Sequence, residues 1–367
     1  MVWLSVMAFF VSLSLGALVL RWSYRIGRAY GQGMPQRIHT GEVPRIGGVA
    51  LLGGILSSWL MGLLSSKLLG DPSSLKLGED TIWLIISILP AVLGGIAEDL
   101  SQRLSVRYRM LLTLLSAFLA VIFMDLRVSR VDLLWLDEAL DFFPWMGVIV
   151  AVIAIAGLPH AFNIIDGCNG LAGMVAIIIC LALAYVALQV GDRAVAAVLV
   201  ITAAATAGFL FWNYPRGMLF AGDGGAYLWG VIIAISSILL VNRNSLISPW
   251  FPMLLLIYPV WETMFSIYRK LVRGMSPGMA DALHFHQLIY RRVVWGVFDD
   301  DVSRDMLMRN NRTSPYLWAF TLLSVIPAVL FWRTTWVLVI CCVIFIILYI
   351  GAYFAIVRFK IPGWMQS

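Results

Sequence analysis

Two apolar segments joined by a short polar turn make up residues 145–190, which read WMGVIVAVIAIAGLPHAFNIIDGCNGLAGMVAIIICLALAYVALQV. An apolar run of roughly 18 or more residues is long enough to cross the hydrocarbon layer of a membrane as a helix. Similar runs recur along the 367 residues, of which 61% are apolar and only 13% are charged. An ordinary soluble domain carries about 25% charged residues. The sequence therefore excludes a soluble globule and predicts an all-α, polytopic integral membrane protein.

About eleven transmembrane helices are predicted where such runs are bounded by charge, Pro or Gly. They cover residues 2–20, 47–69, 81–97, 108–124, 145–164, 169–190, 194–213, 225–241, 250–268, 316–332 and 335–357. Basic residues follow the first run instead of preceding it, which is the reverse of a cleavable signal peptide, so we expect a mature helix there.

Orientation follows from the basic residues, because loops rich in Lys and Arg stay in the cytoplasm. Alternating sides along the chain puts most of the 26 Lys and Arg residues on one face if the N-terminus is outside and the C-terminus is cytoplasmic. We expect a single membrane-embedded domain, residues 1–367, whose active-site face is formed by cytoplasmic loops. Those loops are 21–46, 98–109, 214–224 and 269–315.

The remaining composition narrows the classes of function. A net charge of +6 lies mostly in loops that would face an anionic leaflet, which favours lipid contact over nucleic-acid binding. The four cysteines have no spacing typical of a zinc site. Charged residues of the external loops, such as Arg130, Asp132 and Asp137, are expected to be solvated surface.

Two clusters of polar residues lie in the first half of the chain. Glu98 and Asp99 end the third predicted span and precede Arg103, Arg107 and Arg109, so they indicate either a cation site or a helix end with local ion pairs. The turn between the fifth and sixth spans carries Asn163, Asp166 and Asn169 at intervals of three residues. That spacing lets the three side chains converge on one side, although a plain polar turn is the alternative.

Two further clusters follow on the same predicted face. Asp223 stands among Gly222, Gly224 and Gly225 just before a predicted helix. The glycines would let the backbone approach a ligand closely, and the N-terminus of a helix favours phosphate. A simple helix cap is the alternative. His284 and His286 precede Arg291 and Arg292, which are bases suited to anionic oxygens; a surface pair is the alternative. Carboxylates with phosphate-binding bases are typical of a Mg²⁺ site for phosphoryl chemistry.

These residues resemble the polyprenyl-phosphate N-acetylhexosamine-1-phosphate transferases, glycosyltransferases of family 4 that include bacterial undecaprenyl-phosphate sugar-1-phosphate transferases. The similarity covers most of the chain: residues 43–48 resemble the family's Pro-x-x-Gly-Gly, residues 163–170 its Asn-x-x-Asp-Gly-x-Asp-Gly, and residues 220–225 its Phe-x-Gly-Asp-x-Gly. Departures are Glu98 and Asn169 where the family has Asp, Gln102 where some members have Asp, and Gln287 in place of a His.

The resemblance implies a role for each matching residue. Asp223 would bind Mg²⁺, with Mn²⁺ as an alternative ion, and Phe220 would stack near uracil. Glu98 and Asp99 would lie near the lipid phosphate, with Asp99 as the group that deprotonates or orients it. Asn163 and Asp166 would line the nucleotide site, and His284 and His286 would contact the diphosphate. Arg107 would take the place of a basic residue that follows the acidic pair in the family. The other substrate-binding candidates are Asn169 and Arg291.

The implied reaction moves a sugar 1-phosphate from a UDP-N-acetylhexosamine to a polyprenyl phosphate such as undecaprenyl phosphate, releasing UMP. It would start a cell-envelope glycan such as the O-antigen of lipopolysaccharide, at the cytoplasmic side of the bacterial inner membrane. A homodimer is compatible with the sequence. The alternative function is a multi-span transporter or lipid flippase, for which Glu262 inside the ninth span would be the intramembrane charge; a buried structural Glu is equally compatible.

Overall fold

The structure is a computed structural model that describes residues 1–26, 43–68, 77–276, 278, 283–294 and 302–358. Within these ranges the regular structure is α-helical, which agrees with the predicted class. The helices are α1 Val2–Ile26, α2 Gly47–Leu68, α3 Glu79–Ser101, α4 Val106–Met124, α5 Leu134–Phe142, α6 Pro144–Ile165, α7 Leu171–Gln189, α8 Arg193–Asn213, α9 Gly222–Arg243, α10 Trp250–Leu255, α11 Ile257–Val272, α12 Phe285–Arg292, α13 Val302–Leu330 and α14 Thr335–Val357.

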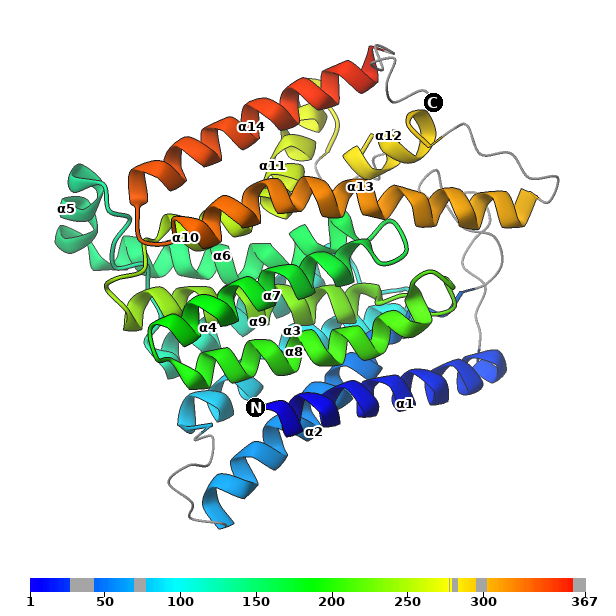
Figure 1. The fold of residues 1–367 in the computed structure, drawn as a ribbon, viewed down its shortest axis with the longest axis horizontal. Coiled ribbons are helices and arrows are strands. Elements are labelled where there is room, and N and C mark those ends of the chain that lie inside the picture. The colour runs from blue at the N-terminus through cyan, green and yellow to red at the C-terminus, as the bar shows by residue number, and fades with distance from the viewer. Residues whose placement is uncertain (27–42, 69–76, 277, 279–282, 295–301, 359–367) are drawn as a thin grey trace.

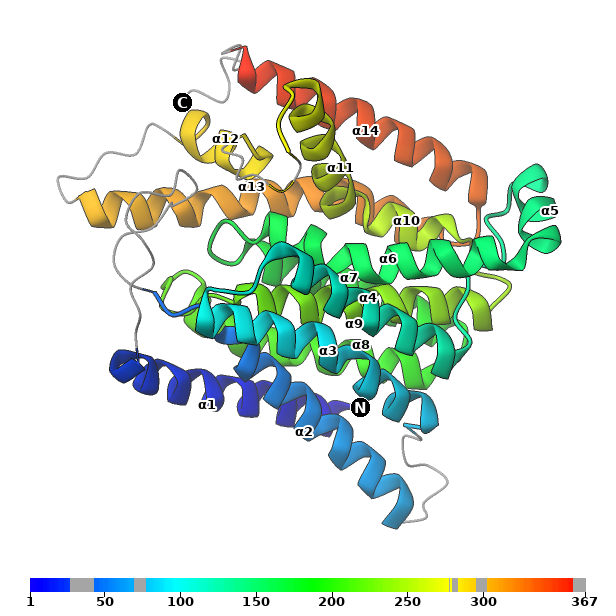
Figure 2. The same cartoon turned by 180° about the vertical axis from the view of Figure 1, so that it is seen from behind.

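Ten of the described helices are long and apolar enough to cross a membrane: α1–α4, α6–α9, α13 and α14. They run roughly alongside one another, and α1 begins at the end of the bundle opposite to the end where α14 finishes (Figures 1 and 2). The chain is therefore a multi-pass membrane protein.

The predicted span 250–268 is instead two helices, α10 and α11, which meet at Leu256. Pro259 has no backbone N–H with which to bond the carbonyl of Leu255, one turn earlier, so a continuous helix would lose a hydrogen bond there. Hydropathy alone does not register this break, because both halves are apolar.

The predicted span 316–332 is also different, because α13 starts fourteen residues earlier at Val302. Its first half is polar and holds an Arg309–Asp305 ion pair of 3.6 Å, one helical turn apart. The loop predicted at 269–315 therefore contains helical structure in its described parts, namely α12 and the first half of α13.

Helix α9 lies at the centre of the bundle, and nearly all of its residues are buried. Small residues let its neighbours come close: a Cβ at Gly95 of α3 would lie 2.6 Å from the backbone nitrogen of Gly224, and one at Gly48 of α2 would lie 2.5 Å from that of Gly225. Glycine at such crossings allows backbone-to-backbone packing between membrane helices. The N-terminus of α9 is thus fixed between α2 and α3.

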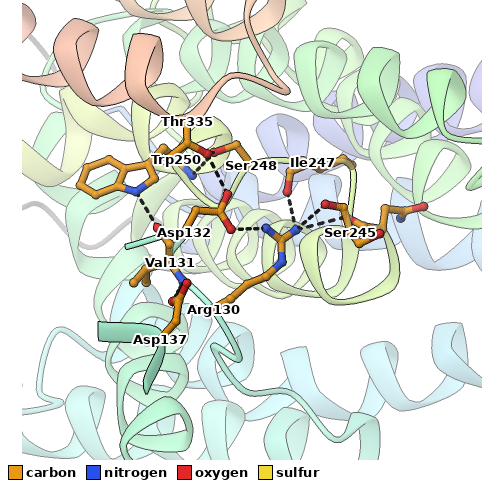
Figure 3. A network of polar contacts seen from close by, with 10 residues as sticks. Arg130, Val131, Asp132, Asp137, Ser245, Ile247, Ser248, Trp250 and Thr335 are labelled. Atoms are coloured by element: carbon orange, nitrogen blue, oxygen red, sulfur yellow. Dashed lines mark hydrogen bonds and ion pairs between the residues drawn. The ribbon is translucent and has the colours of Figure 1, made fainter. Parts of the chain in front are cut away.

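The opposite end of the bundle is tied together by a polar network around Arg130 (Figure 3). The Arg130 guanidinium lies 2.5 Å from Asp132 and donates to the carbonyl of Ile247 at 2.7 Å, while Asp132 accepts from the hydroxyl of Thr335 at 2.7 Å. The indole of Trp250 donates to the carbonyl of Val131 at 2.9 Å. The expectation that Arg130 and Asp132 are solvated surface was wrong, because they are partly buried and join three turns.

Candidate active site

The four polar clusters expected from the sequence gather at one end of the bundle. The turns between α6 and α7 and between α8 and α9 lie there, together with α12, and both views show the same arrangement (Figures 1 and 2). Helix α3 ends and helix α4 begins beside the start of α9, and these helices pack against each other. Residues far apart in the sequence therefore meet at the N-terminus of α9.

Asp99 binds the start of α9 through its backbone. One carboxylate oxygen of Asp99 accepts the N–H of Asp223 and the other accepts the N–H of Gly224, both at 2.9 Å. The first N–H groups of a helix have no partner within the helix, so a carboxylate there satisfies them and favours the positive end of the helix dipole. Asp99 is only 7% exposed, and it acts in this structure as the cap of α9.

The segment that precedes α2 runs along the turn that precedes α9. Phe220 donates its N–H to the carbonyl of Pro44, and Gly47 returns an N–H to the carbonyl of Phe220, each at 2.9 Å. Gly222 has φ of +69°, and a Cβ at this position would meet the carbonyl of Arg45 and the carboxylate of Asp99. The Pro-x-x-Gly-Gly and Phe-x-Gly-Asp motifs are therefore joined by backbone hydrogen bonds.

The side chain of Asp223 points toward partners from three other positions. It forms an ion pair with Arg109 of α4 and accepts a hydrogen bond of 2.7 Å from the side-chain amide of Asn163 of α6. The Tyr227 hydroxyl, one turn along α9, donates to Asp223 over 3.4 Å. A cation, an amide and a hydroxyl thus converge on the Asp223 carboxylate. A second cation, Arg45, lies close enough to Asp99 and Asp166 to interact with both of them.

Asp166 follows the last residue of α6 and faces the same region. Burial raises the pKa of the Asp166 carboxyl to about 7; the nearby charge of Arg45 opposes this rise and that of Asp223 adds to it. A carboxyl with such a pKa exchanges its proton near neutral pH, and perturbed values of this kind are frequent in functional sites.

The two histidines lie at the start of α12. Their rings stack in parallel, with centroids 5.7 Å apart, and the ring of His286 abuts Gly167 in the turn that carries Asp166. His284 faces Glu262 of α11, with its Nδ1 2.9 Å from a carboxylate oxygen. The pKa of His286 is lowered to about 3, chiefly by burial, with the charges of His284 and Arg291 acting in the same direction and that of Glu262 opposing them. His286 is therefore a neutral imidazole packed against the site.

Several predicted residues lie elsewhere or are otherwise engaged. Arg107 is exposed, and Arg109 two residues later makes the ion pair with Asp223. Arg291 is exposed at the end of α12. Glu98 is half-buried and accepts the N–H of Leu104 through one oxygen at 2.7 Å.

Asn169 ties the turn between α6 and α7 to α13. Its side-chain amide donates to Asn311 at 2.9 Å, its backbone N–H donates to Asn310 at 2.7 Å, and its carbonyl accepts from the hydroxyl of Ser314 at 2.6 Å. These bonds give Asn169 a structural part in this conformation, and Asn in place of Asp supplies the donor that Asn311 receives.

Three residues near Asp223 were not singled out from the sequence. Arg45 stands inside the Pro-x-x-Gly-Gly motif, and Arg109 was one of three neighbouring arginines, so both had a signal in the sequence. His160 had none: its ring lies 3.2 Å from the hydroxyl of Thr113 and packs edge-to-face on Tyr227.

A divalent cation would find two carboxylates here, those of Asp166 and Asp223. No group of three His, Cys, Asp or Glu side chains with metal-ligand spacing occurs among the residues that the structure describes. Mg²⁺ is commonly held by one or two carboxylates together with substrate phosphates, so a two-carboxylate site fits such an ion. The mutual repulsion of Asp166 and Asp223 also fits, because a cation between them would relieve it.

Comparison with known proteins gives consistent matches. The profile of glycosyl transferase family 4 matches residues 81–241. The chain is 29% identical over 286 residues to a probable undecaprenyl-phosphate N-acetylglucosaminyl 1-phosphate transferase of Bacillus subtilis, covering 77% of this chain and 76% of that protein.

Two more relatives carry the name undecaprenyl-phosphate alpha-N-acetylglucosaminyl 1-phosphate transferase. The protein from Thermotoga maritima is 27% identical, with 59% of this chain and 63% of the relative covered. The protein from Escherichia coli K12 is 23% identical, with 69% and 66% covered. The matched region contains the side chains that contact Asp223, and the similarity expected from the motifs is confirmed: residues 81–241 match the profile of glycosyl transferase family 4, and the relatives are similar over most of the chain.

Proposed function

We propose that this protein transfers a sugar 1-phosphate from a UDP-N-acetylhexosamine to a polyprenyl phosphate, such as undecaprenyl phosphate, and releases UMP. The observation that carries the proposal is the convergence of Asp223, Arg109 and Asn163 at the N-terminus of the buried helix α9. The names of the relatives support the polyprenyl-phosphate acceptor. The product would be the first lipid-linked unit of a cell-envelope glycan such as O-antigen.

In this reaction an oxygen of the acceptor phosphate attacks the β-phosphorus of the donor, and the bond from that phosphorus to the bridging oxygen of UMP breaks. Both reactants are anions, so the protein must position them and neutralise their charge. Arg109 and Arg45 supply positive charge beside Asp223 and Asp166. His284 and His286 are the groups that we assign to the diphosphate.

We assign Glu98 to the acceptor phosphate in place of Asp99. The sequence suggested Asp99 as the residue that deprotonates or orients this phosphate, with Glu98 in support. Both oxygens of Asp99 accept hydrogen bonds from the backbone of α9, whereas only one oxygen of the half-buried Glu98 has a described partner. Glu98 is therefore the carboxylate better able to receive a proton from, or orient, the incoming phosphate.

A bound Mg²⁺, or Mn²⁺ in its place, would neutralise the diphosphate charge, and Asp166 and Asp223 are the residues that would hold it. Phe220 lies three residues before Asp223 in the turn that precedes α9, and we assign its ring to the uracil. We propose that this end of the bundle faces the cytoplasm in a bacterial inner membrane, which is where UDP-sugars are made. A homodimer is compatible with this arrangement.

The transporter or flippase alternative rested on Glu262 as an unexplained charge at membrane depth. Glu262 is hydrogen-bonded to His284, Phe285 and Tyr349, so its burial has a structural reason within the proposed enzyme. This removes the observation that favoured the alternative.

A test of the function uses the full chain in membranes or lipid nanodiscs with undecaprenyl phosphate. UDP-GlcNAc, UDP-GalNAc, UDP-QuiNAc and UDP-FucNAc, labelled in the sugar, are offered one at a time, and lipid-soluble label is extracted. We expect product from at least one donor, its loss with EDTA, recovery with Mg²⁺, and none from Asp223→Asn. Equal product from Asp223→Asn, or product in EDTA, would contradict the proposed use of Asp223.

A further inference from the structure

Glu262 is a fully buried carboxylate, 0% exposed, in the helix α11 that follows the break at Leu256. It receives hydrogen bonds from two other elements. The N-terminus of α12 contributes His284 Nδ1 at 2.9 Å and the backbone N–H of Phe285 at 3.3 Å. Helix α14 contributes the Tyr349 hydroxyl at 2.5 Å. A buried carboxylate needs such partners, because its desolvation is costly.

The bond to His284 has a chemical consequence beyond packing. A carboxylate has no hydrogen to donate, so Nδ1 of His284 is the donor in this pair. A hydrogen bond at one ring nitrogen fixes the tautomer and orientation of a histidine and leaves the other nitrogen for chemistry. Nε2 is therefore the nitrogen of His284 that remains to meet a substrate.

His284 lies beside the histidine that contacts the proposed site. Its ring stacks on that of His286, with an interplanar angle of 3°. The ring of His286 in turn abuts Gly167, next to Asp166. The hydrogen-bonded chain from Tyr349 through Glu262 to His284 thus ends at the histidine pair, and that pair touches the turn that carries Asp166.

We propose that Glu262 is a positioning residue of the transferase, which holds the proton of His284 on Nδ1 and so presents Nε2 to the donor diphosphate. This inference rests on the proposed function, in which His284 contacts that diphosphate. Tyr349 donates to Oε2 of Glu262, whereas His284 bonds to Oε1. A ring that carries a proton on both nitrogens can donate from Nε2 to a phosphate oxygen while Nδ1 keeps its bond to the carboxylate.

The test is a double-mutant cycle on kcat and KM for the UDP-sugar. Glu262→Gln keeps the shape and removes the charge, and His284→Asn removes the ring. We expect Glu262→Gln to lower kcat about 10- to 100-fold, the range for residues that orient a functional histidine, with a much smaller change in KM. In the His284→Asn background the same substitution should have no further effect, because a residue that acts only through His284 is then silent.

Tyr349→Phe and Tyr353→Phe supply a matched pair of variants on α14. Tyr353 lies one turn from Tyr349 and donates to the carbonyl of Leu283 over 3.4 Å, without reaching Glu262. We expect Tyr349→Phe to lower kcat and Tyr353→Phe to leave it near normal. If Glu262→Gln does not fold, the cycle is run with Tyr349→Phe and His284→Asn instead.

Losses that multiply in the double variant would overturn the proposal, since they would mean that Glu262 acts on the fold and not through His284. Unchanged kcat in Glu262→Gln would overturn it as well. A readout without turnover separates this result from failure of the proposed function: the ¹⁵N spectrum of histidine-labelled protein should show Nδ1 of His284 protonated. An unprotonated Nδ1 in the wild type would contradict the inference whatever the substrate is.

Discussion

The side chain of Asp99 bonds to the backbone N–H of Asp223, so the side chain of Asp223 can bind other residues. The two oxygens of Asp99 accept the N–H groups of Asp223 and Gly224, while the Asp223 carboxylate binds Arg109 and Asn163. Two adjacent acidic positions of the family motif, Glu98 and Asp99, therefore have different surroundings. Both oxygens of Asp99 are bonded to the backbone of α9, whereas the half-buried Glu98 has a partner for only one oxygen among the described residues.

Asp99→Asn should lose stability together with activity. The substituted amide would direct an NH₂ group at one of two buried N–H donors, so that donor would lose its partner. An unsatisfied buried polar group costs about 1–3 kcal/mol. A fall in the midpoint of thermal unfolding in detergent, measured on the same preparation as turnover, is the expected result.

The control for that variant is Glu98→Gln. A Gln side chain still has an oxygen to accept the N–H of Leu104, so the unfolding midpoint should stay close to that of the wild type. Loss of the carboxylate should lower turnover about 100-fold or more, as for a general base. If Glu98→Gln keeps normal turnover while Asp99→Asn loses only turnover, the assignment of the two residues is reversed.

Arg109→Gln should lower activity far more than Arg107→Gln. Arg109 pairs with Asp223, whereas Arg107 is exposed. Removing one partner of a partly buried ion pair leaves the other charge without compensation. Initial rates of the two variants at saturating donor would decide the matter, and a larger loss in Arg107→Gln would favour the role that the family resemblance implied for Arg107.

Arg130→Gln should destabilise the protein and leave its catalytic constants almost unchanged. Arg130 binds Asp132 and the carbonyls of Ser245 and Ile247, all at the end of the bundle away from Asp223 (Figure 3). A hydrogen bond to a charged group contributes about 1.5–3 kcal/mol. The thermal midpoint should fall, and a change in KM for the donor without a change in midpoint would be the opposite result.

The neutral state of His286 predicts how stability depends on pH. The pKa of His286 is lowered by burial to about 3, so the folded protein leaves it uncharged while the unfolded chain, with its ordinary pKa, takes up a proton below about pH 6.5. Stability from this residue is complete above that pH and falls as the pH drops toward 3. We expect His286→Gln to show a shallower fall in thermal midpoint on acidification than the wild type. Parallel curves for the two proteins would show that His286 is charged in the fold.

Much of the membrane architecture followed from hydropathy, because a span needs only length and apolar composition. The two exceptions have local causes that hydropathy does not contain. Pro259 separates α10 from α11 inside an apolar run, and the first half of α13 is helical although it is polar. That half is held by side-chain bonds, among them the one from Asn169 to Asn311.

Site residues could be predicted where they lie inside a motif. They could not be predicted where the packing of a helix decides which of two nearby residues reaches the site. Arg107 and Arg109 differ by two positions, and two positions of a helix point in nearly opposite directions, so only the placement of α4 selects Arg109. The partners of Glu262 are 22 and 87 residues away in the chain, and nothing in the local sequence links them. Asp223 and Asn163 were identified because their motifs already carry glycines and amides at close spacing.

The most direct test of the central claim follows the β-phosphate of the donor. Membranes containing the full chain are incubated with undecaprenyl phosphate and a UDP-sugar labelled with ³²P at the β-position and with ³H in the sugar. We predict that both labels enter the lipid extract in equal amounts and that UMP is released. Transfer of ³H without ³²P, with release of UDP, would contradict sugar-1-phosphate transfer.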